Sequence, residues 1–269
     1  MKVSIITIAY NAANTIADTL GSVAAQSYAD IEHIVVDGRS RDATMAVVEA
    51  HSAPHLRAIS EPDRGVYDAM NKGLAMATGD LIGFLNSDDF LASTDAVATH
   101  VAALEPHADA VCGATVLVAA DNPARITRFY PSKGFRPWML RFGHMPPHPA
   151  FYVRRAAFER IGPFDPDYRI GADLEWMIRF FHVNRRCCTF TDRTFAAMRE
   201  GGISNRGLPS RILINREALR SCRRWGLRTS RALLWSRYLV KTAQPVRRPA
   251  DYPPSPTTRF DAVCRSGAD

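Results

Sequence analysis

The sequence predicts an α/β fold built on one doubly wound, mostly parallel sheet with flanking helices. Short apolar runs alternate along the chain with stretches in which apolar residues recur at helical spacing. The apolar runs are nearly continuous, which is typical of strands that are buried on both faces of a parallel sheet. With 269 residues, 46% of them hydrophobic, the chain is long enough for one large domain with a small appendage.

The first strand is expected at residues 3–9 (VSIITIA), because the run is rich in β-branched residues and ends before Asn11. A helix should follow, since Ile16, Leu20 and Val23 recur at helical spacing. The alternation then repeats, with strands expected at 31–37, 56–60 and 80–85 and helices at 43–50 and 66–77. Helices between successive strands predict parallel pairing.

From about residue 110 the pattern becomes less regular. Strands are expected at 108–119 and 125–130, a Pro- and Gly-rich stretch runs to Pro149, and helices are expected at 156–161 and 172–181. We therefore expect one domain over 1–207, with halves of about 1–109 and 110–207. Residues 208–244 should form one or two basic amphipathic helices, and 245–269, which are rich in proline, a disordered tail.

The net charge of +7 is unevenly distributed. Residues 199–248 hold thirteen Lys and Arg against Glu200 and Glu217, so the rest of the chain is slightly acidic. The basicity belongs to one segment, and nucleic acid is not an expected partner of the domain. A solvated helix face is one interpretation of residues 208–248. Docking on an anionic membrane surface is the favoured one, because apolar residues interleave with the arginines: Trp225, Leu227, Leu233, Leu234, Trp235, Tyr238, Leu239 and Val240.

Several classes of protein are disfavoured. Five cysteines without a CxxC pair support neither a disulfide framework nor a zinc ribbon. The apolar stretch after Lys2 is too short for a signal-peptide core, and no apolar run has the length of a membrane span. We therefore expect a cytoplasmic protein, or one at a membrane surface. The phosphate-binding patterns of NTPases and nicotinamide enzymes are also missing.

Polar residues gather where the predicted strands end. Because ligands of such sheets bind beyond the carboxyl ends of the strands, these residues should line one site. The rim is acidic, so an anionic ligand there would need a divalent cation between it and the protein. The residues at the strand ends are Thr7, Ala9, Tyr10, Asp37, Glu61, Asp63, Asn86, Asp88 and Asp89.

Four motifs carry a resemblance to a known family. They are VSIITIAYN (Val3–Asn11), VVDGRSRDAT (Val35–Thr44), EPDRGVYDAMNKG (Glu61–Gly73) and ATGDLIGFLNSDD (Ala77–Asp89). In this order and spacing they resemble family 2 glycosyltransferases of the GT-A type, and among them the bacterial enzymes that build exopolysaccharide, capsule or glycolipid chains. The resemblance covers about residues 2–204.

The resemblance implies that residues 1–109 bind a nucleotide sugar and that 110–207 receive the acceptor. Thr7 and Ala9 with Asp37 would hold the nucleobase and ribose, next to Tyr10 and Asn11 of the same motif. Asp63 and Arg64 would lie in a loop that closes over the nucleotide. Asn71 and Lys72 would head the helix beside it.

The segment Asn86–Asp89 matches the family's metal-binding acidic motif. The resemblance implies that Asp88 points toward the ribose and Asp89 toward a Mg²⁺ or Mn²⁺ ion. Asn86 stands at the first acidic position of the motif, and an amide is a weaker ligand than a carboxylate. A cation would stabilise the charge that develops on the leaving diphosphate.

Transfer to a hydroxyl also needs a base. YRIGADLEWMIR (Tyr168–Arg179) resembles the family's base-bearing segment, which makes Asp173 the expected base and Glu175 the alternative. PHPAFY (Pro147–Tyr152) resembles a family segment, and the resemblance implies that His148 lies near the acceptor and phosphate. REGGIS (Arg199–Ser204) resembles a glycine loop in which Arg199 and Gly202 would face the diphosphate.

The resemblance therefore predicts an inverting, metal-dependent transfer of one sugar from a nucleoside-diphosphate sugar, UDP-linked by preference, to a glycan or lipid-linked acceptor. SCRRW (Ser221–Trp225) approaches the QxxRW motif of processive synthases, but the Gln is missing. Two alternatives stay open. One is a nucleotidyltransferase, although YNAANT is neither glycine-rich nor basic. The other is a binding protein that has lost activity, which Asn86 and Ala172 favour.

Overall fold

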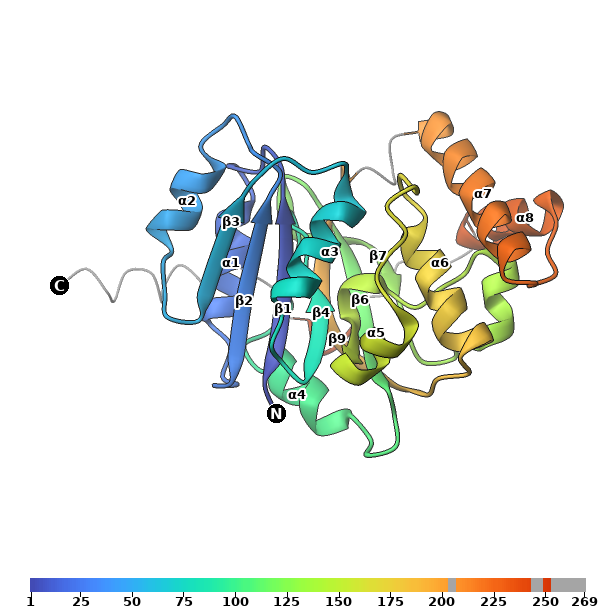
Figure 1. Cartoon of the computed structure of the whole chain (residues 1–269), viewed down its shortest axis with the longest axis horizontal. Coiled ribbons are helices and arrows are strands. Elements are labelled where there is room, and N and C mark those ends of the chain that lie inside the picture. Colours follow the sequence, from blue (N-terminus) through green and yellow to red (C-terminus); the bar gives the residue numbers. More distant parts are fainter. Residues whose placement is uncertain (203–206, 243–248, 253–269) are drawn as a thin grey trace.

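A computed structural model describes residues 1–202, 207–242 and 249–252, and within these a nine-stranded sheet forms the centre of the molecule (Figure 1). The strand order is β3-β2-β1-β4-β8-β6-β9-β5, and β7 pairs with β6. The strands are β1 (Val3–Ala9), β2 (Ile31–Asp37), β3 (Leu56–Ser60), β4 (Leu81–Phe84), β5 (Phe90–Leu91), β6 (Ala110–Ala119), β7 (Asn122–Tyr130), β8 (Phe151–Arg154) and β9 (Cys188–Arg199).

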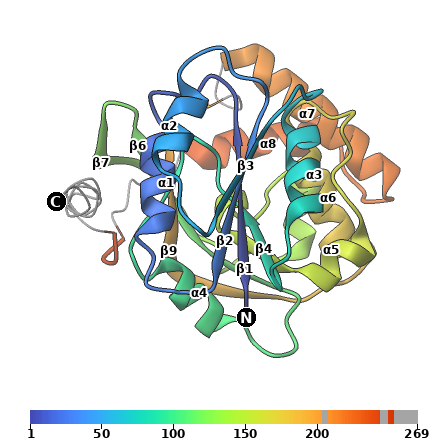
Figure 2. The ribbon, with the colours of Figure 1, turned by 60° about the vertical axis from the view of Figure 1, so that its left-hand side comes forward.

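Helices cover both faces of the sheet. They are α1 (Ile16–Ala24), α2 (Thr44–Ala50), α3 (Val66–Met76), α4 (Ala96–Ala103), α5 (Arg155–Ile161), α6 (Ala172–Ile178), α7 (Gly207–Arg224) and α8 (Arg231–Thr242). Two short 3₁₀ segments, η1 (Pro137–Phe142) and η2 (His148–Ala150), and a π-helical turn, η3 (Arg179–Val183), complete the description. In Figure 2, α1 and α2 lie on one side of β1–β4, and α3, α5 and α6 lie on the other. The α/β fold class predicted from the sequence is confirmed.

The first four strands pair in parallel, as the sequence predicts. β1 pairs with both β2 and β4, and β2 pairs with β3. In this register Ala9 lies opposite Asp37, and Asp37 lies opposite Ser60. The strand ends therefore meet at one edge of the sheet, where the sequence places a ligand site.

The second half of the sheet is mixed. β8 runs antiparallel between β4 and β6, and β9 runs parallel to β6. β5, β8, β9 and α4 are not predicted from the sequence. β5 and β8 are too short to show a period, and β9 carries Asp192 and Arg193 near its centre. The pairing of Phe90 with Ala197 brings β9 beside the segment that follows β4.

The basic segment folds against the domain. α7 packs on α6, and α8 packs on η1 and α7. Leu234 is fully buried, and Trp225 and Leu227 are partly buried and pack against the main core. The expected membrane-facing role of Leu234 is therefore wrong, because the domain itself covers this side of α8. In the described residues, no helix is long and apolar enough to cross a membrane.

The expectation of a disordered tail is wrong at residues 249–252. Tyr252 is 2% exposed and packs with Phe90, Val116 and Val118. Its hydroxyl donates to the carbonyl of Pro123 over 3.0 Å. The rest of the predicted tail, residues 245–248 and 253–269, lies outside the described residues.

Candidate active site

Asp37 forms the centre of the polar edge at the ends of β1, β2 and β3. Its side chain is fully buried, and its carboxylate accepts hydrogen bonds from Ser40 N (2.9 Å), Ser40 Oγ (2.5 Å) and Ser60 Oγ (2.6 Å). These bonds fix the loop that follows β2. The sequence motifs identify Asp37 but not Ser60, which only the pairing of β2 with β3 brings to it.

Asn11 joins the loop after β1 to the loop after β2. Its φ of 50° is left-handed, a conformation that asparagine tolerates better than most residues. Its side-chain oxygen accepts from Arg41 N over 2.9 Å, and its own N–H donates to Ser40 Oγ over 2.7 Å. The neighbouring Tyr10 is 61% exposed, so its ring is available to a ligand.

The loop that carries Asp63 lies against the same edge. A Cβ at Gly38 would lie 2.4 Å from Asp63 Oδ2 and 3.4 Å from Tyr10 Cδ2, so a larger residue there would displace the Asp63 carboxylate from this approach. Asp63 Oδ1 accepts from Gly65 N over 2.9 Å. Asp63, Tyr10 and Gly38 thus form one wall of the site.

Two of the expected ligand contacts at the ends of β1 differ from the prediction. Thr7 is fully buried, and its hydroxyl lies 2.9 Å from His33 Nε2, inside the sheet. Burial lowers the pKa of His33 to about 3, so the ring is neutral. The expected contact of the Thr7 side chain with a nucleotide is therefore wrong. Ala9 is 5% exposed and can contribute little more than its backbone.

The expected roles of Asn71 and Lys72 also change, because both side chains hold other parts of the chain. Asn71 donates to the carbonyl of Phe164 over 2.8 Å and accepts from Phe164 N over 2.9 Å, which uses its amide in a structural contact. Lys72 Nζ donates to the carbonyl of Pro62 over 2.6 Å and lies 2.8 Å from a Glu61 carboxylate oxygen. Both therefore fix loops beside the site.

Most of the Arg64 side chain is exposed to solvent. Its side chain is 74% exposed and makes a 3.4 Å ion pair with Asp68 on the first turn of α3. Its backbone N–H donates to Asp68 Oδ2 over 3.0 Å, which ties the loop to the helix. Arg64 is therefore placed on the loop predicted to close over the nucleotide.

The acidic motif after β4 places its two carboxylates differently. Asp89 is 3% exposed, and its carboxylate accepts from Asn86 Nδ2 (3.1 Å) and Arg199 N (3.3 Å). Burial and the nearby Asp88 raise the pKa of Asp89 well above its usual range. Asp88 is only partly buried. Asp88 is thus the more accessible carboxylate and Asp89 lies behind it, and the contact of Asp89 with a cation stays a prediction.

Arg199 and Gly202 lie next to this motif, and their expected contact with a diphosphate stays a prediction. The Arg199 guanidinium makes an ion pair with Asp18 of α1 and stacks over the Phe90 ring at 5.3 Å. Its Nε is buried without a hydrogen-bond partner. A Cβ built at Gly202 would lie 4.0 Å from Asp88 Oδ2. Residues 203–206 of the predicted glycine loop lie outside the described residues.

The donor atoms of this corner fit a hard divalent cation. Asp88 provides a carboxylate and Asn86 an amide oxygen, and Mg²⁺ is commonly bound by one or two carboxylates together with substrate phosphates. Burial raises the pKa of Asp88, and the positive charge of Arg199 acts in the opposite direction. No group of three His, Cys, Asp or Glu side chains with metal-site geometry occurs in the described parts of the chain. Phosphate oxygens would therefore have to complete the coordination.

Asp173 stands on the first turn of α6, as expected for a base. Its Oδ1 accepts from Leu174 N over 2.8 Å and lies 3.4 Å from the hydroxyl of Tyr67. Burial raises the pKa of Asp173 to about 6. A carboxylate with this pKa can accept a proton near neutral pH.

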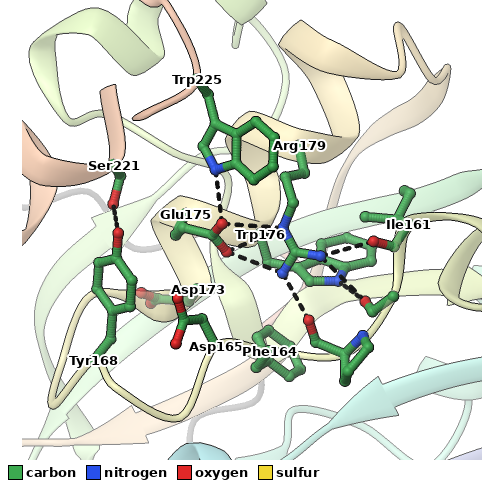
Figure 3. Close-up of polar contacts among 12 residues, drawn as sticks. Ile161, Phe164, Asp165, Tyr168, Asp173, Glu175, Trp176, Arg179, Ser221 and Trp225 are labelled. Atoms are coloured by element: carbon green, nitrogen blue, oxygen red, sulfur yellow. Dashed lines mark hydrogen bonds and ion pairs between the residues drawn. The ribbon is translucent and has the colours of Figure 1, made fainter. Parts of the chain in front are cut away.

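Glu175, the alternative base, has a different environment. It is 1% exposed, and it makes an ion pair with Arg179 at 2.9 Å. Trp225 Nε1 donates to its Oε1 over 2.7 Å (Figure 3). Because both oxygens are occupied inside the protein, Glu175 is not placed to contact an acceptor, and that alternative is wrong.

His148 packs among aromatic rings. Its ring stacks on Phe84 with centroids 5.6 Å apart and meets Phe164 edge-on at 6.1 Å. Burial lowers the pKa of His148 to about 4, so the imidazole is neutral at neutral pH. Its expected contact with the phosphate therefore lacks a positive charge, although a neutral imidazole can still accept or donate a hydrogen bond.

Comparison with known proteins places the chain among glycosyltransferases. The family model described as glycosyl transferase family 2 matches residues 4–162. A PGL/p-HBAD biosynthesis glycosyltransferase of Mycobacterium bovis (strain BCG / Pasteur 1173P2) is 35% identical over 207 residues, which cover 75% of this chain and 78% of that protein. An uncharacterized glycosyltransferase of Mycobacterium tuberculosis (strain ATCC 25618 / H37Rv) is 36% identical over 187 residues, which cover 66% and 68%.

Solved structures share the fold. S. aureus TarS 1-349 in complex with UDP-GlcNAc superposes with a TM-score of 0.63 at 20% identity, covering 81% of this chain and 66% of that one. A mannosyltransferase from Pyrobaculum calidifontis in complex with GDP-Man and Mn²⁺ superposes with a TM-score of 0.61 at 20% identity, covering 99% and 79%. Together with the family match, this similarity shows that the chain belongs to glycosyl transferase family 2 and is a sugar-transferring enzyme with the GT-A fold.

Proposed function

We propose that this enzyme transfers one sugar, with inversion, from a nucleoside-diphosphate sugar to a hydroxyl of a lipid-linked glycan or glycolipid. Asp173 carries the proposal, because it is a partly buried carboxylate beside Tyr67 with a pKa near that of an efficient base at neutral pH. Relatives that act in PGL/p-HBAD biosynthesis support an acceptor of this kind. A UDP-sugar is the preferred donor, and the UDP-GlcNAc complex of TarS supports it.

In the proposed reaction Asp173 accepts the proton of the acceptor hydroxyl while that oxygen bonds to the anomeric carbon of the sugar. The bond from this carbon to the diphosphate breaks, and its electron pair leaves with the phosphate oxygen. Attack from the side opposite the leaving group inverts the anomeric configuration. To offer its positive charge to the leaving diphosphate, Arg199 would have to release its ion pair with Asp18.

The nucleotide would occupy the edge formed by the first three strands. Tyr10 offers an exposed ring, Asp37 and Asn11 fix the loops around it, and Asp63 and Arg64 lie on the neighbouring loop. Asp88, with Asn86 beside it and Asp89 behind, would hold Mg²⁺ or Mn²⁺. The cation would stabilise negative charge on the diphosphate, and the Mn²⁺ complex of the mannosyltransferase supports this.

Asp173→Asn tests the base. We expect the variant to lose turnover by several orders of magnitude while it keeps its affinity for the donor, because the substitution removes the proton acceptor and little else. Thermal shifts with UDP, GDP, dTDP and CDP, each with and without Mn²⁺ or Mg²⁺, would identify the donor nucleotide. Normal transfer by Asp173→Asn would show that the base is elsewhere, and no response to any nucleotide would favour a binding protein that has lost activity.

We further propose that the enzyme works at an anionic membrane surface. After folding, Leu208, Ile212 and Trp235 stay exposed on α7 and α8, and Trp138 on η1 is 59% exposed. Arg211 of α7 stacks over Tyr238 of α8, which in turn packs on Trp235. Basic and aromatic side chains of the two helices therefore lie next to one another. Basic residues gain about 1 kcal/mol each near an anionic bilayer. The cytoplasmic location expected from the sequence stays a prediction.

Sedimentation with vesicles tests this surface. We expect binding to vesicles that contain phosphatidylglycerol, with weaker binding at higher salt because the Debye length shortens. Trp235→Ser should reduce binding, since it removes an exposed aromatic group. Equal binding to neutral phosphatidylcholine vesicles, or none to either, would contradict the proposal.

A further inference from the structure

Glu217 of α7 holds the backbone that leads into the base-bearing helix. Its carboxylate accepts hydrogen bonds from three successive N–H groups: Arg169 N at 2.9 Å, Ile170 N at 3.0 Å and Gly171 N at 2.8 Å. Glu217 is 7% exposed, so these bonds are shielded from water. The last of these amides lies two residues before Asp173.

The same backbone segment is held from the other side by α3. The hydroxyl of Tyr67 donates to the carbonyl of Ile170 over 2.5 Å and lies 3.4 Å from Asp173 Oδ1. Ile170 is therefore fixed through its N–H by Glu217 and through its carbonyl by Tyr67. The position of Asp173 depends on both of these side chains.

Side chains on one face of α7 contact the residues around this backbone segment. Ser221 Oγ donates to Tyr168 Oη over 3.1 Å, and Arg220 stacks over the Tyr168 ring at 4.5 Å. One turn further, Arg224 makes a 2.6 Å ion pair with Asp165. Figure 3 shows Ser221 of α7 reaching Tyr168, and Trp225, directly after α7, reaching Glu175. Residues 217, 220, 221 and 224 follow helical spacing and together line this contact.

The approach of α7 is close at Gly171. A Cβ built there would lie 3.1 Å from both Glu217 Cβ and Glu217 Oε2, which is tighter than an ordinary contact. A larger residue would push the carboxylate away from the three amides. The sequence thus has a small residue where Glu217 needs room.

We propose that Glu217 is a positioning residue for Asp173, and that α7 is for this reason part of the catalytic machinery and not an appendage. The inference rests on the proposed function, in which Asp173 is the base. A carboxylate suits the role because its two oxygens can accept from all three N–H groups. Glutamine has one accepting oxygen, and its NH₂ group would face donors.

The charge of Glu217 also acts on the base. The titratable groups that face Asp173 are Glu217 from α7 and Tyr67 from α3. Burial raises the pKa of Tyr67 well above its usual range, so this phenol stays neutral. Burial is the main reason for the raised pKa of Asp173, and the negative charge of Glu217 raises it further.

Glu217→Gln in the full chain is the direct test. We expect kcat to fall between about tenfold and a hundredfold, because small displacements of a catalytic group have effects of this size. The KM for the donor should stay within about twofold, since Glu217 is not placed to contact the donor. The acidic limb of the pH profile of kcat/KM should move to lower pH, because the negative charge near Asp173 is gone.

Two variants and a control make the result specific. Glu217→Asp keeps the charge and should recover part of kcat without the shift in the pH profile. Gly171→Ala keeps Glu217 and should reduce kcat by displacing its carboxylate, which keeps the test available if Glu217→Gln does not fold. Glu159→Gln, the same substitution on the exposed surface of α5, should leave all parameters unchanged.

The outcomes separate this inference from the proposed function. A folded Glu217→Gln variant with normal kcat and an unmoved pH profile overturns the positioning role. A Gly171→Ala variant does so if its lowered stability shows that the contact with Glu217 is disturbed while its kcat stays normal. If Asp173→Asn is inactive in the same assay, only the positioning role fails. If Asp173→Asn is active, the assignment of the base fails whatever Glu217→Gln does.

Discussion

Trp225, directly after α7, donates its indole N–H to Glu175 of α6 over 2.7 Å, and this bond joins two residues that are 50 positions apart in the sequence. Glu175 also binds Arg179, whose guanidinium donates to the carbonyls of Ile161 and Pro163 at 2.8 and 2.7 Å. The cluster therefore connects α5, α6 and α7 through one buried ion pair. It explains why the acidic residue two positions after Asp173 serves structure and not proton transfer.

We predict that Glu175→Gln lowers the free energy of unfolding by about 3–5 kcal/mol, because it leaves the Arg179 charge buried without a partner. Trp225→Phe should cost less, about 1.5–3 kcal/mol, since it removes one hydrogen bond to a charged group. Urea denaturation measures both, with Glu49→Gln on the exposed surface of α2 as the control. A stable but inactive Glu175→Gln variant would instead mean that Glu175 takes part in catalysis.

We predict that kcat/KM of the wild-type enzyme falls below about pH 6, where Asp173 becomes protonated and cannot accept the acceptor proton. Ionisation of this group is unfavourable in the folded protein, because its pKa is raised by burial. Stability should therefore decrease as the pH rises from the unfolded pKa of about 4 toward 6. Asp173→Asn stays neutral and should be about 1–2 kcal/mol more stable at pH 7. Denaturant titrations at pH 4 and pH 7 check this, and equal stability of both proteins at pH 7 would contradict it.

We predict that Asn71→Ala lowers the free energy of unfolding by about 1–3 kcal/mol, because it removes the partners of both backbone groups of Phe164. Donor affinity should change by less than about threefold. Asn122→Ala, at an exposed position of β7, is the matched control and should cost less. If Asn71→Ala is fully stable but binds the donor weakly, Asn71 contacts the nucleotide as the family resemblance implies, and the prediction is wrong.

We predict that Asn86→Asp tightens Mn²⁺ binding in the presence of the nucleotide, since a carboxylate is a stronger ligand than an amide. Without a cation the same variant should melt at a lower temperature, because the new charge would face Asp89 where Asn86 now donates a 3.1 Å hydrogen bond. Thermal shifts and calorimetric Mn²⁺ titrations measure the two effects, with Asn122→Asp as the control. Removal of divalent cations with EDTA should abolish transfer by the wild-type enzyme, and undiminished transfer would exclude the cation from the reaction.

The local pattern of the sequence determined the first half of the fold. Continuous apolar runs predicted the positions of β1, β2, β3 and β4 in the sequence. The helices between these strands predicted that they pair in parallel. Parallel pairing in turn collects the strand ends at one edge, so Asp37, Asp63 and Asp88 could be assigned to one site before any coordinates were known. The motif spacing also gave the family.

The roles of single polar side chains were decided by tertiary structure. Thr7 and His33 pair across two strands, and Asn71 contacts Phe164 from 93 residues away. Glu217 reaches the amides before α6 from a helix that the sequence predicts as basic and amphipathic, without indicating what it packs against. A motif records which residue types occur at which spacing, whereas a buried hydrogen bond depends on which distant group the folded chain places opposite the side chain. That information exists only once the layers have packed together.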